Sequence, residues 1–182
     1  MDFYIPLLTD TVVQRAKGIK LLIMDVDGVL SDGKVYYTAS EKIIKGFFVR
    51  DGLGIVLLHQ NNVQTAIITG RDDACVRLRA QELNIKHYFA GYTNKNIAFN
   101  KLMAQTGLQY PEIAYIGDDI IDLPIITKVG LAVAVKDAHP SIKPYCHYVT
   151  NNIAGQGAVR ELCDIILYAR NKLTAVMDQF ML

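Results

Sequence analysis

The residues of this sequence best suited to chemistry are two aspartates separated by one residue. Asp25 and Asp27 come directly after the apolar run 21–24, and Gly28 follows them. Positions 25 and 27 project to the same side of an extended chain, so the two carboxylates lie close together. Such a pair is tolerated when a cation is bound or when one member is protonated. One ionised aspartate can then act as a nucleophile while the other, protonated, acts as a general acid toward a leaving alkoxide.

A second acidic group, made of Asp118, Asp119 and Asp122, follows the apolar run 113–116. Carboxylates are hard oxygen ligands, and together with Asp25 they would form a Mg²⁺ site that water and a substrate phosphate complete. The metal would neutralise the carboxylates and the phosphate together. Asp119 and Asp122 can equally cap the helix that follows, so both interpretations of these two residues stay open.

Two further segments carry groups that can hold a phosphoryl oxyanion. Thr69, Gly70 and Arg71 follow the apolar run 65–68, and Lys95 lies at the start of an expected helix. A hydroxyl, a backbone N–H and an ammonium near a helix N-terminus are the groups that such an oxyanion needs. Thr69 alone can be a helix cap, and Lys95 alone can be a surface lysine. Their recurrence at the ends of successive strand–helix units favours a phosphate site.

The elements that would position these residues alternate between short apolar runs and amphipathic stretches, as parallel strands joined by crossover helices do. We expect strands at 20–24, 65–68, 87–90, 113–116, 131–135 and 148–150. We expect helices, most of them opening with Asp or Asn as N-cap, at 51–61, 72–84, 94–107, 119–128 and 157–172. This pattern predicts an α/β fold with a doubly wound, Rossmann-like parallel sheet. Ligands bind beyond the carboxyl ends of the strands in such sheets, where the residues above fall.

One segment interrupts this alternation. After the turn residues at 31–33, β-branched and aromatic residues flank a short polar stretch, which predicts an inserted β-hairpin at about 34–49 with its second strand over 43–49. Too few residues remain for a second domain. We therefore expect one domain over 1–182, with no cap domain, an apolar C-terminal tail at about 173–182, and an active site without a lid of its own.

Composition limits the class of function. The chain has 182 residues, of which 51% are hydrophobic and 20% charged, with a net charge of +1 and no block of like charge. These values are typical of a globular protein and favour a small-molecule partner over nucleic acid or an anionic membrane. The N-terminal segment reads as neither a signal peptide nor a membrane span, and three scattered cysteines favour a reducing compartment. We expect a cytoplasmic location, and the four histidines lack the pairing of a zinc site.

These segments together resemble a known superfamily. The motifs of the haloacid dehalogenase phosphatases are matched, in order, by DVDGV at 25–29, TGR at 69–71, Lys95, and GDD at 117–119 with Asp122. Joint occurrence in order is far more specific than any single motif. The resemblance is closest to the capless phosphatases of sugar-acid phosphates. The features that narrow it are the longer run 25–33, the hairpin, the run 50–54 and the missing cap. The resemblance covers roughly residues 19–172.

The resemblance implies a role for each matching residue. Asp25 would be the nucleophile and a Mg²⁺ ligand, and Asp27 would be the general acid/base and would offer its backbone carbonyl to the metal. Asp118 would be the remaining protein ligand, with Asp119 and Asp122 supporting the metal shell.

The resemblance also implies what binds and what assembles. Thr69, Gly70 and Lys95 would bind phosphate, and Arg71 is a candidate to reach a sugar-acid substrate. The implied substrate is 3-deoxy-D-manno-octulosonate 8-phosphate, hydrolysed in lipopolysaccharide precursor synthesis, with a nine-carbon sugar-acid 9-phosphate as the alternative. Members of this capless group form homotetramers in which the hairpins associate and a neighbouring subunit closes each site.

Two other classes of protein share some of these features. A receiver domain also combines a doubly wound sheet with acids, Mg²⁺, Thr and Lys, but it carries its acidic pair on the first strand and its phosphorylated Asp alone later. Here the Asp25-x-Asp27 pair comes early and Asp118-Asp119 late. A noncatalytic module is disfavoured because buried charged residues without partners cost stability.

Overall fold

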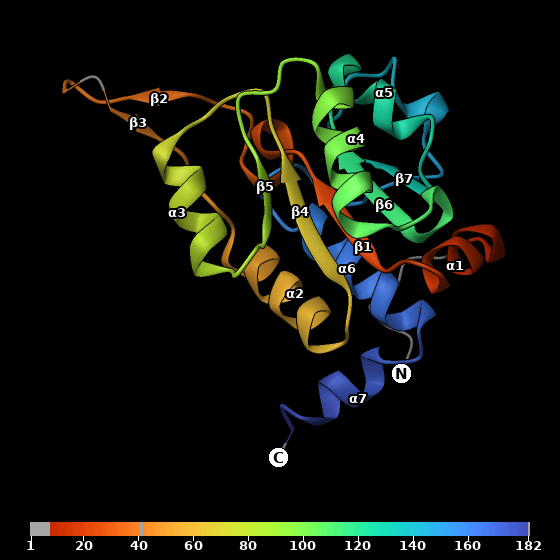
Figure 1. Cartoon of the computed structure of the whole chain (residues 1–182). Helices are drawn as coiled ribbons and strands as arrows, with labels where there is room; N and C mark the ends of the chain where they lie inside the picture. The colour runs from red at the N-terminus through yellow and green to blue at the C-terminus, as the bar shows by residue number, and fades with distance from the viewer. Residues whose placement is uncertain (1–7, 41, 182) are drawn as a thin grey trace.

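The structure is a computed structural model that describes residues 8–40 and 42–181 (Figure 1). Its centre is a six-stranded sheet in the order β5-β4-β1-β6-β7-β8, in which every neighbouring pair is parallel. The strands are β1 (Leu21–Met24), β4 (Gln64–Ile68), β5 (His87–Phe89), β6 (Ile113–Gly117), β7 (Leu131–Ala134) and β8 (Tyr148–Val149). The predicted α/β fold with a Rossmann-like parallel sheet is confirmed, and all six predicted strands are present.

Helices cover both faces of this sheet. On one face α1, α2 and α6 pack together, and α4 packs with α5 on the other (Figure 1). The helices are α1 (Asp10–Lys17), α2 (Val49–Gln60), α3 (Ala74–Glu82), α4 (Lys95–Thr106), α5 (Leu123–Ile126), α6 (Ala158–Ala169) and α7 (Leu173–Asp178). Short helical turns lie at η1 (Val26–Leu30), η2 (Tyr110–Glu112), η3 (Ile120–Asp122) and η4 (Lys143–Tyr145). None of the helices in the described ranges is long and apolar enough to cross a membrane.

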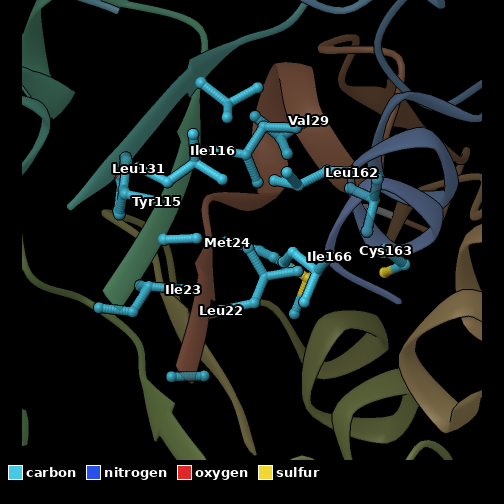
Figure 2. Packing of buried hydrophobic residues seen from close by; sticks show 14 of the residues in the cluster. Leu22, Ile23, Met24, Val29, Tyr115, Ile116, Leu131, Leu162, Cys163 and Ile166 are labelled. Atoms are coloured by element: carbon cyan, nitrogen blue, oxygen red, sulfur yellow. The ribbon is translucent and has the colours of Figure 1, made fainter. Parts of the chain in front are cut away.

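Strand β1 lies in the middle of the core because helices cover it from both sides. All four of its residues are buried, as a strand with two covered faces requires. Figure 2 shows Leu22 on the side that faces Leu162 and Ile166 of α6, while Ile23 points to the other side. This packing fixes the position of the chain where Asp25 begins.

The inserted hairpin is present as a separate antiparallel pair, β2 (Tyr36–Tyr37) and β3 (Ile43–Ile44), that projects from the body of the molecule (Figure 1). The expectation that its second strand runs over 43–49 is wrong, because β3 ends at Ile44 and the chain enters α2 at Val49. The N-cap of that helix is Phe48, which offers no side-chain acceptor, so the predicted start at Asp51 missed the first turn.

Two helices differ from the prediction by more than a shifted end. The helix expected over 119–128 divides into η3 and α5, because the Asp122 carboxylate turns inward and binds the start of its own turn. Helix α1 was not predicted. It buries Val12 and Ala16 against the body, and the hydroxyl of the N-cap residue Thr9 accepts a hydrogen bond from the N–H of Val12.

Asp51 explains why α2 is tied to α6. Its Oδ1 accepts a hydrogen bond from the backbone N–H of Arg160, at 2.7 Å, in the first turn of α6. The residue is almost completely buried. Burial raises the pKa of Asp51 to about 6, and the hydrogen bonds from this helix start only partly oppose the increase.

This raised pKa predicts a pH-dependent stability. The folded state holds the Asp51 proton more tightly than the unfolded state does. Protonation of Asp51 therefore stabilises the folded state fully below about pH 3.8, and this stabilisation is lost as the pH rises through about 6. The variant Asp51→Asn keeps an oxygen acceptor but cannot titrate. We expect the melting temperature of the variant minus that of the wild type to increase between about pH 4 and 7. A difference that does not change with pH, measured by calorimetry in chelator, would contradict this assignment.

Candidate active site

The expected site residues meet at the carboxyl edge of three adjacent strands. Met24, the last residue of β1, is level with Ile67 of β4 on one side and Ile116 of β6 on the other. Asp25 and Asp118 follow the ends of β1 and β6 immediately, and Thr69 follows the end of β4 in the same way. The parallel register therefore brings together residues that are widely separated in the sequence.

Lys95 joins two of the aspartates. Its buried ammonium lies 2.8 Å from Oδ2 of Asp25 and 2.6 Å from Oδ1 of Asp122. Burial alone would lower the pKa of Lys95, but the two carboxylates outweigh it and raise the pKa above its ordinary value. Lys95 is therefore a fixed positive charge beside Asp25, at the start of α4.

Asp122 lies at the centre of this network and is completely buried. Its Oδ1 also accepts a hydrogen bond of 2.5 Å from the hydroxyl of Tyr115, and its Oδ2 accepts one of 2.9 Å from the N–H of Asp118. Asp122 thus fixes the loop that carries Asp118. Asp119 is exposed, and its Oδ1 caps η3 by accepting a hydrogen bond from the N–H of Ile120 at 2.7 Å.

Three carboxylates are arranged so that they can hold a cation. Oxygens of Asp25, Asp118 and Asp122 lie within 4.8 Å of one another. Burial, together with the charges of Asp25 and Asp122, raises the pKa of Asp118 to about 8. Burial, opposed by Lys95, raises the pKa of Asp25 to about 6. Oxygen ligands that repel one another in this way suit Mg²⁺, because the ion removes the repulsion.

Gly28 allows the two acidic loops to approach each other. Its φ of +82° belongs to the left-handed region, and a Cβ added there would overlap the carboxylate of Asp118. Any other residue would push Asp118 away from Asp25. The glycine after the aspartate pair is thus required both for the turn and for the proximity of the second acidic group.

Asp27 faces a different set of charges. Its Oδ1 lies 2.5 Å from Nζ of Lys45, and its Oδ2 lies 3.9 Å from Nε of Arg71. Arg71 also binds Asp73, with 3.0 Å between Nε and Oδ2. Asp27 is therefore not a member of the three-carboxylate group, and its side chain lies on the hairpin side of the site.

The TGR segment lies where the neighbouring strand ends. Thr69 is buried, and its N–H donates to the carbonyl of Phe89 in β5. Gly70 is half-buried, with room beside its Cα, and Arg71 is exposed. The segment lies next to β1 and leaves Arg71 at the surface.

The sequence interpretation did not identify Tyr115, Lys45 or Asp73 as part of the site. A tyrosine inside the apolar run 113–116 was a signal, because its buried hydroxyl needs a partner. A lysine between Ile44 and the Gly-Phe-Phe run of the hairpin was another. Neither signal indicated which carboxylate it would meet.

A hollow of about 480 Å³ lies elsewhere, at the opposite, amino end of β4 and β5. It is lined by His59, Thr65, Lys86 and His87 among others. None of the predicted site residues contributes to it, so it is separate from the aspartate site.

The fold and site together define a class of protein. A doubly wound sheet with an aspartate pair after its central strand, a lysine at a later helix start and a second acidic loop is the arrangement of a haloacid dehalogenase-like hydrolase. The model of the haloacid dehalogenase-like hydrolase family matches residues 89–162.

Similarity over nearly the whole chain identifies the family more narrowly. The chain is 49% identical to the 3-deoxy-D-manno-octulosonate 8-phosphate phosphatase KdsC of Yersinia pestis, covering 91% of this chain and 89% of that protein. It is 46% identical to KdsC of Escherichia coli strain K12, covering 97% and 93%. The chain belongs to the KdsC phosphatase family.

Solved structures agree with this assignment. The crystal structure of the phosphatase from Moraxella catarrhalis, in complex with magnesium, phosphate and KDO, has a TM-score of 0.93 and 40% identity, covering 95% of this chain and 99% of that one. The cobalt-bound enzyme of Haemophilus influenzae has a TM-score of 0.88 and 41% identity, covering 93% and 100%. Membership of this family sets aside the receiver-like alternative.

Proposed function

We propose that this chain is a Mg²⁺-dependent phosphatase that converts 3-deoxy-D-manno-octulosonate 8-phosphate to the free sugar acid and phosphate, as a step in lipopolysaccharide precursor synthesis. One observation carries the proposal: a complete network of Asp25, Asp118, Asp122 and Lys95 occurs in a chain that is 46–49% identical to enzymes named for this reaction. The related structure that holds magnesium, phosphate and KDO supports the same substrate and cofactor. Three cysteines that form no disulfide support a cytoplasmic location.

The side chains divide the reaction into two steps. Asp25 attacks phosphorus and forms an aspartyl phosphate, while Asp27 gives its proton to the departing sugar oxygen. Asp27 then takes a proton from the water that hydrolyses the intermediate. Lys95 keeps Asp25 ionised and compensates the negative charge that gathers on the phosphoryl oxygens.

The cation would be held by the carboxylates of Asp25 and Asp118 and by the backbone carbonyl of Asp27. When bound, Mg²⁺ supplies positive charge that offsets the charge of the carboxylates and of the phosphate. Asp122 supports this site by holding the N–H groups of Asp118 and Asp119. Asp119 belongs to the same supporting loop.

The substrate would be held by the neighbouring loops. Thr69, Gly70 and Lys95 bind the phosphate from the ends of β4 and the start of α4. Arg71, at the surface beside them, is placed to meet the carboxylate of a sugar acid. This division gives Arg71 a role in choosing the substrate rather than in the chemistry.

We also propose that the protein works as a homotetramer that associates through its hairpins. Tyr37 is 71% exposed and Ile44 is 54% exposed, which is unusual for side chains of this size on a projecting hairpin. Lys45, directly after the second strand of the hairpin, contacts Asp27, so a subunit seated on the hairpin would lie beside the site.

The tetramer can be tested with a hairpin variant. The double variant Tyr37→Asp and Ile44→Asp places like charges on the proposed interface, so we expect sedimentation to show a smaller species than the wild-type tetramer. Tyr145→Asp changes an exposed tyrosine of η4 outside the hairpin and should leave the mass unchanged. A wild-type monomer at micromolar concentration would contradict the proposal.

Phosphate release tests the proposed reaction. The assay compares 3-deoxy-D-manno-octulosonate 8-phosphate with a nine-carbon sugar-acid 9-phosphate and with neutral sugar phosphates, each in Mg²⁺ and in chelator. We expect kcat/KM for the first to exceed that for the neutral sugars by about 100-fold or more, because a site with a cation for the sugar-acid carboxylate disfavours sugars that lack that group. Equal rates in chelator, or no release from any substrate, would contradict the proposal.

A further inference from the structure

The base of the hairpin delivers a buried ammonium to the aspartate pair. Lys45 follows β3 directly, and its side chain is completely shielded from solvent although the hairpin itself projects. Its Nζ lies 2.5 Å from Oδ1 of Asp27 and 2.7 Å from Oδ2 of Asp73. Asp73 is the N-cap residue of α3, so one ammonium connects three separate segments.

These contacts are ion pairs, defined by the short distances between charged atoms and not by hydrogen-bond geometry. Neither Nζ of Lys45 nor Oδ1 of Asp27 has a hydrogen-bond partner of good geometry in the described part of the chain. Both atoms are inaccessible to solvent, whereas the Asp27 side chain as a whole is 26% exposed. The accessible part of the Asp27 carboxyl group is therefore on the side of Oδ2.

Lys45 and Lys95 are both fully buried, but their partners differ. Nζ of Lys45 lies within ion-pair distance of Asp27 and Asp73, whereas Nζ of Lys95 lies beside Asp25, the proposed nucleophile. Arg71, which is exposed, is the cation that faces outward in this group, and it holds Asp73 from the other side at 3.0 Å. Asp27 is thus the residue through which Lys45 contacts the reacting groups.

We propose that Lys45 is a positioning residue for the general acid/base. It holds Oδ1 of Asp27 in the interior, so that Oδ2 alone faces the reacting groups. Asp73, fixed by Arg71, holds the ammonium from behind. This inference rests on the proposed function, because it assigns Asp27 the two proton transfers. In the first, a carboxylate oxygen of Asp25 bonds to phosphorus as the bond from phosphorus to the sugar oxygen breaks, and the proton of Asp27 goes to that oxygen. In the second, a water oxygen bonds to phosphorus as the bond to Asp25 breaks, which frees the Asp25 carboxylate, and a proton of the water goes to Asp27.

The test separates proton transfer from phosphoryl binding. A sugar alkoxide needs a proton to leave, whereas p-nitrophenolate leaves without one. For Lys45→Met we expect kcat with the sugar phosphate to fall about 100-fold, within the range of general acid–base catalysis. The first turnover of p-nitrophenyl phosphate, seen as a nitrophenolate burst, should stay within about 3-fold of the wild type. The following steady state should be slow, because hydrolysis of the aspartyl phosphate needs Asp27.

A binding measurement and control variants complete the design. The increase in melting temperature caused by Mg²⁺ with beryllium fluoride, a phosphoryl mimic, should be the same in Lys45→Met and wild type. Lys17→Met removes an exposed lysine at the end of α1 and should change none of these quantities. Lys45→Arg should recover part of kcat with the sugar phosphate because it keeps the positive charge. If Lys45→Met does not fold, Lys45→Gln and Lys45→Arg provide the same comparison without and with the charge.

The outcomes distinguish this inference from the proposed function. The role of Lys45 alone would be overturned by either of two results obtained with an active wild type. In one, Lys45→Met retains kcat on the sugar phosphate; in the other, its nitrophenolate burst falls as much as that kcat. An inactive wild type would overturn the proposed function and this inference together.

Discussion

Replacing Asp25 by Asn is expected to reduce phosphate release by at least about 10⁴-fold, as the loss of a covalent nucleophile does in other enzymes. The amide has nearly the size of the carboxyl group but cannot form an acyl phosphate. Asp25 is buried after β1, and Lys95 keeps its second partner Asp122 in the variant, so the fold should remain. Steady-state phosphate release and circular dichroism measure the two effects.

A matched control separates this loss from a general effect of removing a carboxylate. Asp10→Asn changes an exposed aspartate in the first turn of α1 and should leave activity within about 2-fold. Mass spectrometry of acid-quenched wild-type protein during turnover should find one phosphoryl group on the peptide that contains Asp25. Activity of Asp25→Asn above about one tenth of wild type would contradict the covalent mechanism.

Replacing Lys95 by Met is expected to damage stability and activity together. The variant leaves the carboxylates of Asp25 and Asp122 buried without the cation between them, and breaking a buried ion pair on one side costs about 3–5 kcal/mol. The loss of a charge aimed at the transferring phosphoryl group should lower kcat by about 10²–10³-fold. Urea unfolding in chelator and phosphate release in Mg²⁺ measure the two losses.

Magnesium provides the diagnostic comparison for this variant. Because a bound cation neutralises the same carboxylates, Mg²⁺ should stabilise Lys95→Met more than it stabilises the wild type, although kcat stays low. Lys17→Met is the control on an exposed helix end. Unchanged stability of Lys95→Met in chelator would show that the Lys95 ammonium does not hold Asp25 and Asp122 together.

Much of the fold could be predicted because its signals are local. The apolar runs that became β1, β4, β6 and β7 are short and continuous, as strands covered on both faces must be. Boundaries were less predictable where a side chain serves a distant partner. Asp51 looked like a helix start in the sequence, but its carboxylate binds the first turn of α6, and α2 begins at Val49 instead.

In the candidate site too, local motifs predicted which residues gather, but not which distant partners they contact. The order of the motifs identified Asp25, Asp27, Asp118 and Lys95, because the carboxyl ends of parallel strands must meet at one edge of the sheet. The Lys95 ammonium was expected near a phosphate. The structure shows that it lies between two carboxylates, one of which, Asp122, accepts a hydrogen bond from Tyr115.

The sequence by itself determined the type of sheet, the inserted hairpin and the residues gathered at the carboxyl edge, since these follow from apolar periodicity and from motifs within single strand–helix units. Only the tertiary structure decided which charges face each other. Lys45 and Asp27 are separated in the sequence by both strands of the hairpin, and nothing local makes them meet. Their pairing depends on where the base of the hairpin meets η1 and the start of α3, because ion pairs between distant segments are set by packing and not by sequence spacing.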